Sequence, residues 1–292
     1  LLHPARSGRF VFSLLFLLFT FPVAYSATYT WDATANTLVI TLGTNESLSI
    51  NVSGVSVGFS LSAGTFSQIG PDLGIGSGTS SLTIPAADLV TSLTVNNTGA
   101  GTGTNNVTFN GGTITSTTIA INPAAAGTVC TIGFATANTT FAATNTSLIA
   151  SKNVVVNSGI TLQTSSGNLL IEANQQATPT TGDFYGVSLD NSTIKTTGSG
   201  TITIKGRGGD GSSINQRGVS VVNGGRIEGG SGTLTVIGTG GPGTVLTNSG
   251  VFVNNPNSII TSGGDVQVTG TGGGTGTSGY NTGVQCSFGG VI

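Results

Sequence analysis

A tandem repeat in the second half of the sequence constrains the fold more than any other feature. Two units of 32 residues, 201–232 and 233–264, lie end to end; a unit of 33 residues (168–200) precedes them, and an incomplete unit (265–292) follows. Self-similarity at a fixed period is typical of structural units that stack on their neighbours, rather than of a globular core with one centre. The sequence therefore predicts a solenoid.

Each unit contains three short stretches in which apolar residues alternate with other residues. Because alternate residues of a strand face the same side of a sheet, the pattern predicts three strands per unit, each with one buried face. Thr, Val and Ile dominate these stretches, as strands prefer. The apolar positions are Leu169/Ile171, Ile202/Ile204, Leu234/Val236 and Val266/Val268 in the first stretch, Val187/Leu189, Val219/Val221, Val251/Val253 and Val284/Cys286 in the second, and Ile194, Ile227 and Ile259 in the third.

Rungs of three short strands, stacked in parallel about 4.8 Å apart, would align equivalent residues and bury a continuous apolar column. The predicted fold class is all-β, a right-handed parallel β-helix with rungs of about 32 residues. A propeller blade of about 40–45 residues or a leucine-rich repeat of about 20–29 does not fit this period. We expect residues 92–167 to form earlier, irregular rungs. Residues 27–91 are expected to form an N-terminal β cap over the exposed end of the stack.

Three asparagines recur at one offset in the repeat and predict a structural ladder. Asn191, Asn223 and Asn255 each lie five residues after the Gly that opens the second strand of their unit. Stacked Asn side chains can hydrogen-bond along a column. A preference of Asn for turns would not by itself repeat the same offset three times.

The two cysteines are not expected to form a disulfide. Cys286 takes the inward position that Leu189, Val221 and Val253 hold in the other units, so it is predicted to be a small buried apolar residue. Cys130 lies several rungs away, whereas a disulfide needs neighbouring Cα atoms.

Residues 1–26 have the features of a secretory signal peptide. Arg6 and Arg9 give a positive start, an apolar run of 12 residues (10–21) follows, and Ala24–Ser26 forms a small-x-small cleavage site. The run is too short for an ordinary membrane span, and no second long apolar run follows. We expect a protein that is secreted or held at the cell surface, without a transmembrane helix in the mature chain. The sequence lacks an initiator Met and stops inside a repeat, so it is expected to be a fragment.

Charge and composition argue against several classes of function. Once Arg6, Arg9 and His3 are removed with the leader, six basic and ten acidic residues remain, and no His. A nucleic-acid partner is not expected because there is no basic stripe. Nucleophilic triads and His-containing zinc sites need a residue that the mature chain lacks. The repeat carboxylates do not coincide in adjacent units. We predict no catalytic residue, no cofactor and no metal site.

The motif Gly206–Gly211 formally matches G-x-G-x-x-G. A dinucleotide site also needs a helix at the third Gly, whereas here a further strand is predicted. Asp210 resembles one position of a calcium-binding repeat but stands alone.

The long segments after each first strand should project from one side as a Gly-rich ridge. Aromatic rings there could stack on sugar faces; alternatively, they fold back over the core. An unknown extracellular protein or glycan is the expected partner. The predicted ligand-contact residues are Phe184, Tyr185, Arg207, Asp210, Arg217 and Tyr280.

The rungs follow the pattern G-V-x-V…N…x-I-x-x-G-x-G-x-[LIV]-x-V-x-G-x-G-G. Together with the leader, this pattern resembles bacterial filamentous-haemagglutinin-like and autotransporter-type surface adhesins. The run Ile171–Gln176 is similar to large repeat surface proteins of planctomycete-type bacteria. The chain departs from the N-P-N-G-I-like elements of haemagglutinins that are exported by a partner protein: Asn122–Ala124 does not match, and Asn255–Ser258 lies inside a repeat. No catalytic residue is carried over.

The resemblance implies a secreted or cell-surface stalk that is structural or adhesive, with an outer-membrane export partner. Two alternatives stay open. One is a secreted β-helix enzyme that acts on polysaccharide through two carboxylates. The other is an autotransporter passenger whose effector domain lies beyond residue 292.

Overall fold

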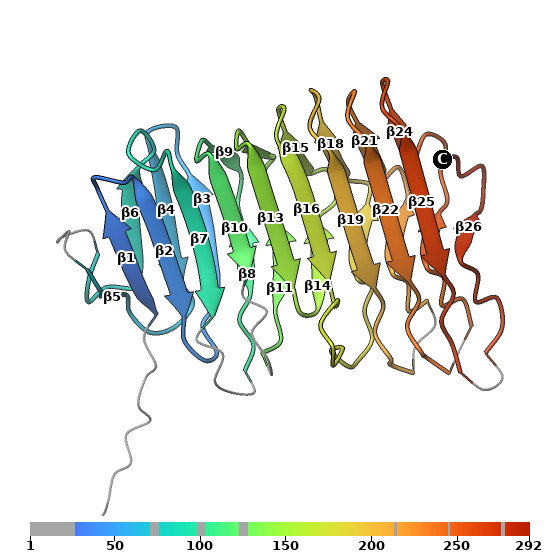
Figure 1. The fold of residues 1–292 in the computed structure, drawn as a ribbon. Helices are drawn as coiled ribbons and strands as arrows, with labels where there is room; N and C mark the ends of the chain where they lie inside the picture. The colour runs from blue at the N-terminus through green and yellow to red at the C-terminus, as the bar shows by residue number, and fades with distance from the viewer. Residues whose placement is uncertain are drawn as a thin grey trace, which may run out of the picture.

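A computed structural model describes residues 27–70, 76–97, 103–122, 128–212, 215–244, 246–275 and 278–292. The predicted leader, 1–26, lies outside the described residues. These ranges contain 26 strands, and no helix is found in them. The strands form two ten-stranded sheets and one six-stranded sheet, with successive rungs stacked from the blue end of Figure 1 to the red end. The predicted all-β parallel β-helix is confirmed.

Each complete rung, from β7–β9 to β22–β24, contributes one strand to each sheet. The first sheet contains β1 (Thr28–Asp32), β2 (Thr37–Leu42), β5 (Ser67–Gln68), β7 (Ser92–Asn97), β10 (Thr118–Asn122), β13 (Asn145–Ala150), β16 (Asn168–Ala173), β19 (Ile202–Arg207), β22 (Leu234–Thr239) and β25 (Val266–Thr271). The second contains β3 (Leu48–Val52), β4 (Ser56–Leu61), β6 (Ser81–Pro85), β8 (Val107–Phe109), β11 (Thr131–Phe134), β14 (Asn153–Val156), β17 (Val187–Asp190), β20 (Val219–Val222), β23 (Val251–Val253) and β26 (Val284–Cys286). The third contains β9 (Gly112–Ile114), β12 (Thr139–Phe141), β15 (Thr161–Thr164), β18 (Thr193–Thr196), β21 (Arg226–Gly229) and β24 (Ile259–Thr261).

The register of the parallel sheets confirms the apolar columns that the repeat predicts. In the first sheet Leu169 pairs with Ile202, Ile202 with Leu234, and Leu234 with Val266. The second and third sheets continue in the same way, through Val187–Val219–Val251–Val284 and through Ile194–Ile227–Ile259. The residues of these columns are buried in the three complete units, whereas Val266 and Val284 of the last unit are exposed.

The rungs differ in length before and after residue 168. Ser92, Thr118, Asn145 and Asn168 follow one another in register, so the early rungs advance by 26, 27 and 23 residues. From β16 onward the advance is 33, 32 and 32 residues. Much of the difference lies between the first and second sheets, where two residues join β13 to β14 but 13 join β16 to β17.

The N-terminal end of the stack consists of antiparallel strands. β2 and β3 pair in parallel with β7 and β8 and so form the first layer of the stack. β1 then runs antiparallel to β2, β4 to β3, and β6 to β4. Because these strands occupy the edges that a bare parallel layer would expose, the segment 27–91 covers this end.

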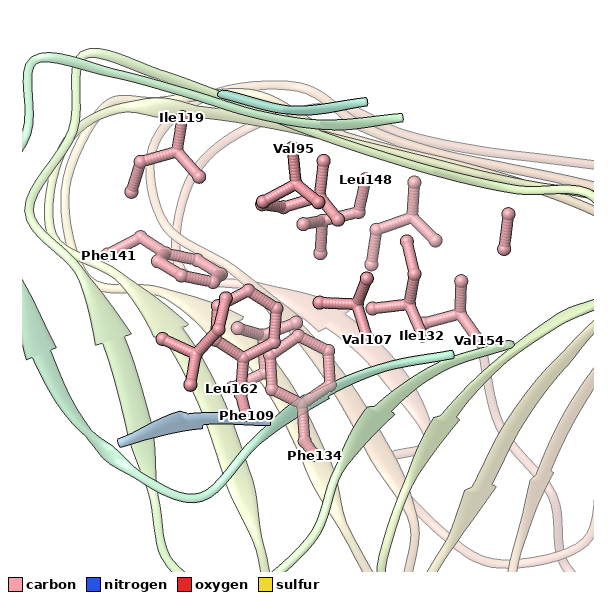
Figure 2. Close-up of a cluster of buried hydrophobic side chains, with 14 of the residues drawn as sticks. Val95, Val107, Phe109, Ile119, Ile132, Phe134, Phe141, Leu148, Val154 and Leu162 are labelled. Atoms are coloured by element: carbon pink, nitrogen blue, oxygen red, sulfur yellow. The ribbon is translucent and has the colours of Figure 1, made fainter. Parts of the chain in front are cut away.

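An aromatic cluster fills the interior of the early rungs. Phe109 and Phe134 are register partners, and their rings stack at 5.0 Å with an interplanar angle of 8°. Phe141 meets Phe109 edge-on at 5.3 Å. Figure 2 shows these rings between the side chains of the facing sheets. All three are buried, so this part of the core is rich in aromatic surface.

The predicted Asn ladder is wrong. The three side chains are all described, and none bonds another: Asn191 Nδ2 donates to Ser158 Oγ (2.9 Å), and Asn223 Nδ2 donates to Asp190 Oδ1 (2.9 Å). Asn255 Nδ2 donates to the carbonyl oxygen of Gly225 (3.0 Å). Asn191 and Asn223 have φ angles of 50° and 54°, a left-handed conformation that Asn tolerates better than most residues. The local backbone therefore explains these two asparagines.

The prediction for Cys286 is correct in register and wrong in burial. Cys286 pairs with Val253, as the repeat requires, but it is exposed because no described rung stacks on β26. Cys130 is buried, and burial raises the pKa of its thiol. Both cysteines are free in the structure.

Candidate ligand-binding site on the loop ridge

The segments between the first and second sheets stack into one ridge along the molecule. Backbone bonds repeat from loop to loop: Gly209 N–H donates to Phe184 O (3.1 Å), Gly241 N–H to Gln216 O (2.7 Å), and Gly273 N–H to Asn248 O (2.8 Å). In Figure 1 the ridge runs along the lower edge, below β16, β19, β22 and β25. The ridge consists of residues 174–186, 208–218, 240–250 and 272–283, apart from 213–214, 245 and 276–277, which are outside the described residues.

Close backbone approach explains the glycines of the G-x-G-x-x-G match. A Cβ atom at Gly206 would lie against the carbonyl oxygen of Gly218, and one at Gly208 against that of Gln216. The following units repeat the first of these contacts, at Gly238 with Gly250 and at Gly270 with Gly283. The two arms of each loop therefore meet at contact distance. The third Gly of the match leads through the loop to strand β20, not to a helix.

A ladder of side-chain amides holds the ridge together. Gln216 Oε1 accepts from Phe184 N–H, Asn248 Oδ1 accepts from Gln216 N–H, and Asn281 Oδ1 accepts from Asn248 N–H, each at 3.0 Å. Each amide lies two residues before the Gly that opens the second strand of its unit. This ladder was not predicted from the sequence, although the shared offset from Gly218, Gly250 and Gly283 is a signal that indicates it.

Replacing Asn248 by alanine should destabilise the ridge. Asn248 is fully buried, and the substitution leaves the buried Gln216 N–H without its acceptor. A buried donor without a partner costs about 1–3 kcal/mol. We expect a loss of this size in the free energy of unfolding, measured by urea denaturation. The exposed Asn51 provides the control: Asn51→Ala should change stability by no more than about 0.5 kcal/mol. Equal effects of the two substitutions would contradict the ladder's role.

A hollow of about 340 Å³ opens on the outer face of the second sheet, beside the ridge. Its floor includes Val155 of β14 and Ser188 of β17, which are register partners facing away from the core. The loop 174–186 and the next loop supply the walls. The lining residues are Asn153, Val155, Asp183, Phe184, Tyr185, Ser188, Asn215 and Gln216. Apolar, amide and carboxylate groups thus converge on one concave surface.

The two aromatic residues of the hollow differ in exposure. Phe184 is only 8% exposed, so its ring folds back against the protein, and Lys152 Nζ lies 5.5 Å from the ring centroid. Tyr185 is half-buried. Tyr185 is therefore the more accessible ring for a ligand in this hollow.

Arg217 supports Tyr185 from one side. Its guanidinium carbon lies 5.7 Å from the centroid of the Tyr185 ring and 3.5 Å from that of the Phe252 ring. Nη2 donates to Asn215 Oδ1 (2.9 Å), and Nη1 donates to Ser220 Oγ (3.3 Å). Burial lowers the pKa of Arg217. A guanidinium that contacts two rings, with both terminal nitrogens bonded, holds the Tyr185 side of the hollow in place, although Arg217 does not itself line the hollow.

The remaining predicted contact residues lie elsewhere. Arg207 and Asp210 line a smaller hollow of about 180 Å³ with Pro179, Thr180, Gly208 and Pro242. Asp210 Oδ1 accepts from Gly182 N–H (2.7 Å), so this carboxylate ties adjacent loops together. Tyr280 is 74% exposed and lines neither hollow. The structure thus brings Phe184, Tyr185 and Arg217 together. Arg207, Asp210 and Tyr280 lie away from this group.

Two ion pairs lie on the rungs. Lys205 Nζ lies 2.9 Å from Glu172 Oε1 on the neighbouring strand, and Arg226 Nη1 lies 3.4 Å from Glu228 Oε1. Within the described ranges, no group of three His, Cys, Asp or Glu residues is placed to hold a metal ion. No helix in that part of the chain has the length and apolarity to cross a membrane.

Comparison of the chain with protein-family models, with curated proteins and with solved structures finds no match in any of the three.

Proposed function

We propose that the chain belongs to a secreted or surface-held β-helix protein of the filamentous-haemagglutinin-like or autotransporter type, and that it acts as a structural and adhesive stalk. In this proposal the hollow beside Tyr185 contacts an extracellular glycan. The leader-like start of the sequence and the stacked repeat support the stalk. The observation that carries the adhesive role is the hollow itself, where a half-buried ring meets several hydrogen-bonding side chains.

The lining suits a sugar better than a strongly charged ligand. An aromatic ring offers an apolar face of the kind that stacks on a pyranose ring. The amides of Asn153 and Asn215 and the carboxylate of Asp183 can exchange hydrogen bonds with hydroxyl groups. The small residues of the floor, Val155 and Ser188, leave the outer face of the sheet open beside the ring. Arg217 and Gln216 hold the surrounding loops in place through the contacts described above.

The test is binding of the purified chain to a panel of immobilised bacterial and host glycans. Truncating an aromatic anchor usually costs about 2 kcal/mol or more of binding free energy, so Tyr185→Ala should weaken binding by more than about tenfold. Tyr280→Ala is the matched control because Tyr280 lies on the same ridge outside the hollow. It should leave affinity unchanged.

Two results would overturn this assignment of the site. One is equal binding by Tyr185→Ala and the wild type, and the other is an equal loss in both tyrosine variants. Release of reducing ends from a bound polysaccharide by the wild-type chain would instead support an enzyme with two carboxylates.

A further inference from the structure

A buried carboxylate lies at the N-terminal end of the stack. Glu46, between β2 and β3, is 2% exposed. Its Oε2 accepts from Gly43 N–H (2.7 Å), and its Oε1 accepts from Ala27 N–H (2.9 Å). Its own N–H donates to Asn105 Oδ1 (3.1 Å). Burial raises the pKa of Glu46, and the two backbone hydrogen bonds oppose this only in part.

No side-chain cation can reach this carboxylate from the nearby sequence. Between residues 10 and 151 the chain contains no Lys, Arg or His. The strands packed around Glu46 carry two other titratable groups, Tyr29 and Asp32 of β1; the Tyr29 hydroxyl donates to Gln68 Oε1. A buried carboxylate is costly unless a positive charge compensates it. Within residues 10–151, the cation that the chain can supply is therefore a free α-ammonium group, formed if the chain is cut there.

Ala27 is placed to supply that group. It follows the small-x-small motif Ala24–Ser26, where the sequence predicts removal of the leader. Ala27 is fully buried, its nitrogen lies 2.9 Å from Glu46 Oε1, and its carbonyl oxygen accepts from Ser67 N–H (2.8 Å). The nitrogen that would become an ammonium therefore already contacts the carboxylate.

We infer that the Ser26–Ala27 bond is hydrolysed during export and that the new α-ammonium of Ala27 forms a buried ion pair with Glu46. Water adds across the peptide bond: Ser26 leaves with a carboxylate on the leader, and Ala27 keeps the nitrogen and becomes protonated. Because Ala27 is buried in the folded chain, the leader peptidase of the exporting cell must act before the cap closes. Maturation thus completes the charge balance of the cap. The inference rests on the export part of the proposed function.

The ion pair sets a pH dependence. An α-amino group titrates near pH 7.7–8.0 in an unfolded chain, roughly, and a carboxylate partner raises its pKa in the folded state. Its contribution is then fully present below the unfolded pKa and is lost as the pH rises through the folded pKa. Glu46→Gln removes the partner and so removes this dependence.

The experiment uses the full chain with its leader, produced in a secreting bacterium. N-terminal sequencing should give Ala27 as the first residue of the exported protein. Urea denaturation of the exported protein is then measured at about pH 7 and at about pH 9.5. The unfolding equilibrium constant should be larger at about pH 9.5 than at about pH 7. We expect this rise to be about tenfold greater for the wild type than for Glu46→Gln, which corresponds to a pKa shift of one unit. Glu228→Gln, at an outer ion pair, should respond like the wild type.

A second variant keeps the test valid if Glu46→Gln fails to fold. One Gly inserted between Ser26 and Ala27 leaves Glu46 in place but moves the ammonium one residue away, and it should abolish the extra pH response. Export with a different first residue, or equal pH responses in the wild type and this variant, would overturn the inference and leave the proposed function intact. Retention of the chain inside the cell would count against both.

Discussion

Gly238→Ala is expected to lower the free energy of unfolding by about 3 kcal/mol. Gly238 pairs with Gly206 and Gly270 in the first sheet, where the chain turns into the ridge. An added Cβ would lie against the carbonyl oxygen of Gly250 and 2.7 Å from Cγ2 of Val251. Backbone on the facing arm can move away only by disturbing the strands above and below it. Urea denaturation followed by far-ultraviolet circular dichroism measures the loss.

Gly263→Ala is the matched control from the same repeat unit. Nothing lies within 4 Å of a Cβ built at Gly263, and the residue has no positive φ angle. The change in stability should stay within about 0.5 kcal/mol. A loss at Gly238 no larger than that at Gly263 would contradict the close approach of the loop arms. Stacked repeats can unfold in parts, so fluorescence of Trp31, in the cap, should be recorded beside the circular dichroism.

Phe134→Ala should cost about 3–5 kcal/mol, the usual range for removing a buried aromatic ring. Phe134 is fully buried, stacks on Phe109 at 5.0 Å and lies 6.2 Å from Phe141. Figure 2 shows that its ring fills the space between sheets, so the substitution leaves a cavity in the middle of the early rungs. The free energy of unfolding from denaturant titration is the measured quantity.

Phe288 provides the comparison for the aromatic core. It is 88% exposed, so Phe288→Ala removes little buried surface and should change stability by less than about 0.5 kcal/mol. If Phe134→Ala were as mild as Phe288→Ala, the early rungs would not share the packed core that we describe.

The regular rungs could be predicted because their inward positions hold apolar residues at a constant period. The early rungs were harder to predict, and the strands β12 and β13 were not singled out from the sequence. In β12 the inward residues are Thr139 and Phe141, and in β13 Thr146 takes the column position between Ile119 and Leu169. A polar residue at a buried position breaks the alternation that identifies a strand. The changing rung length also removes the fixed offset that aligns the later units.

The site was predictable only within single loops. Phe184 and Tyr185 are adjacent in sequence, so both could be predicted as ligand-contact residues without knowing how the strands of neighbouring rungs align. Asn153 and Val155 reach the same hollow from the preceding rung, across a loop whose length differs from the one before it. The contact of Arg217 with Phe252 likewise joins neighbouring rungs, and it becomes visible only after the strands are aligned. The Asn ladder was a wrong prediction because a shared offset in the sequence need not mean mutual bonding: at Asn191 and Asn223 it reflects the left-handed backbone conformation.

The central functional claim is that this β-helix acts outside the cell. The most direct measurement is fractionation of bacteria that produce the chain from its own leader, with an antibody against residues 27–292 and added protease as the probe of exposure. We expect a leader-free chain in the medium or on the surface, open to the antibody and the protease in intact cells. A protease-protected chain in the cytoplasm that retains residues 1–26 would contradict it.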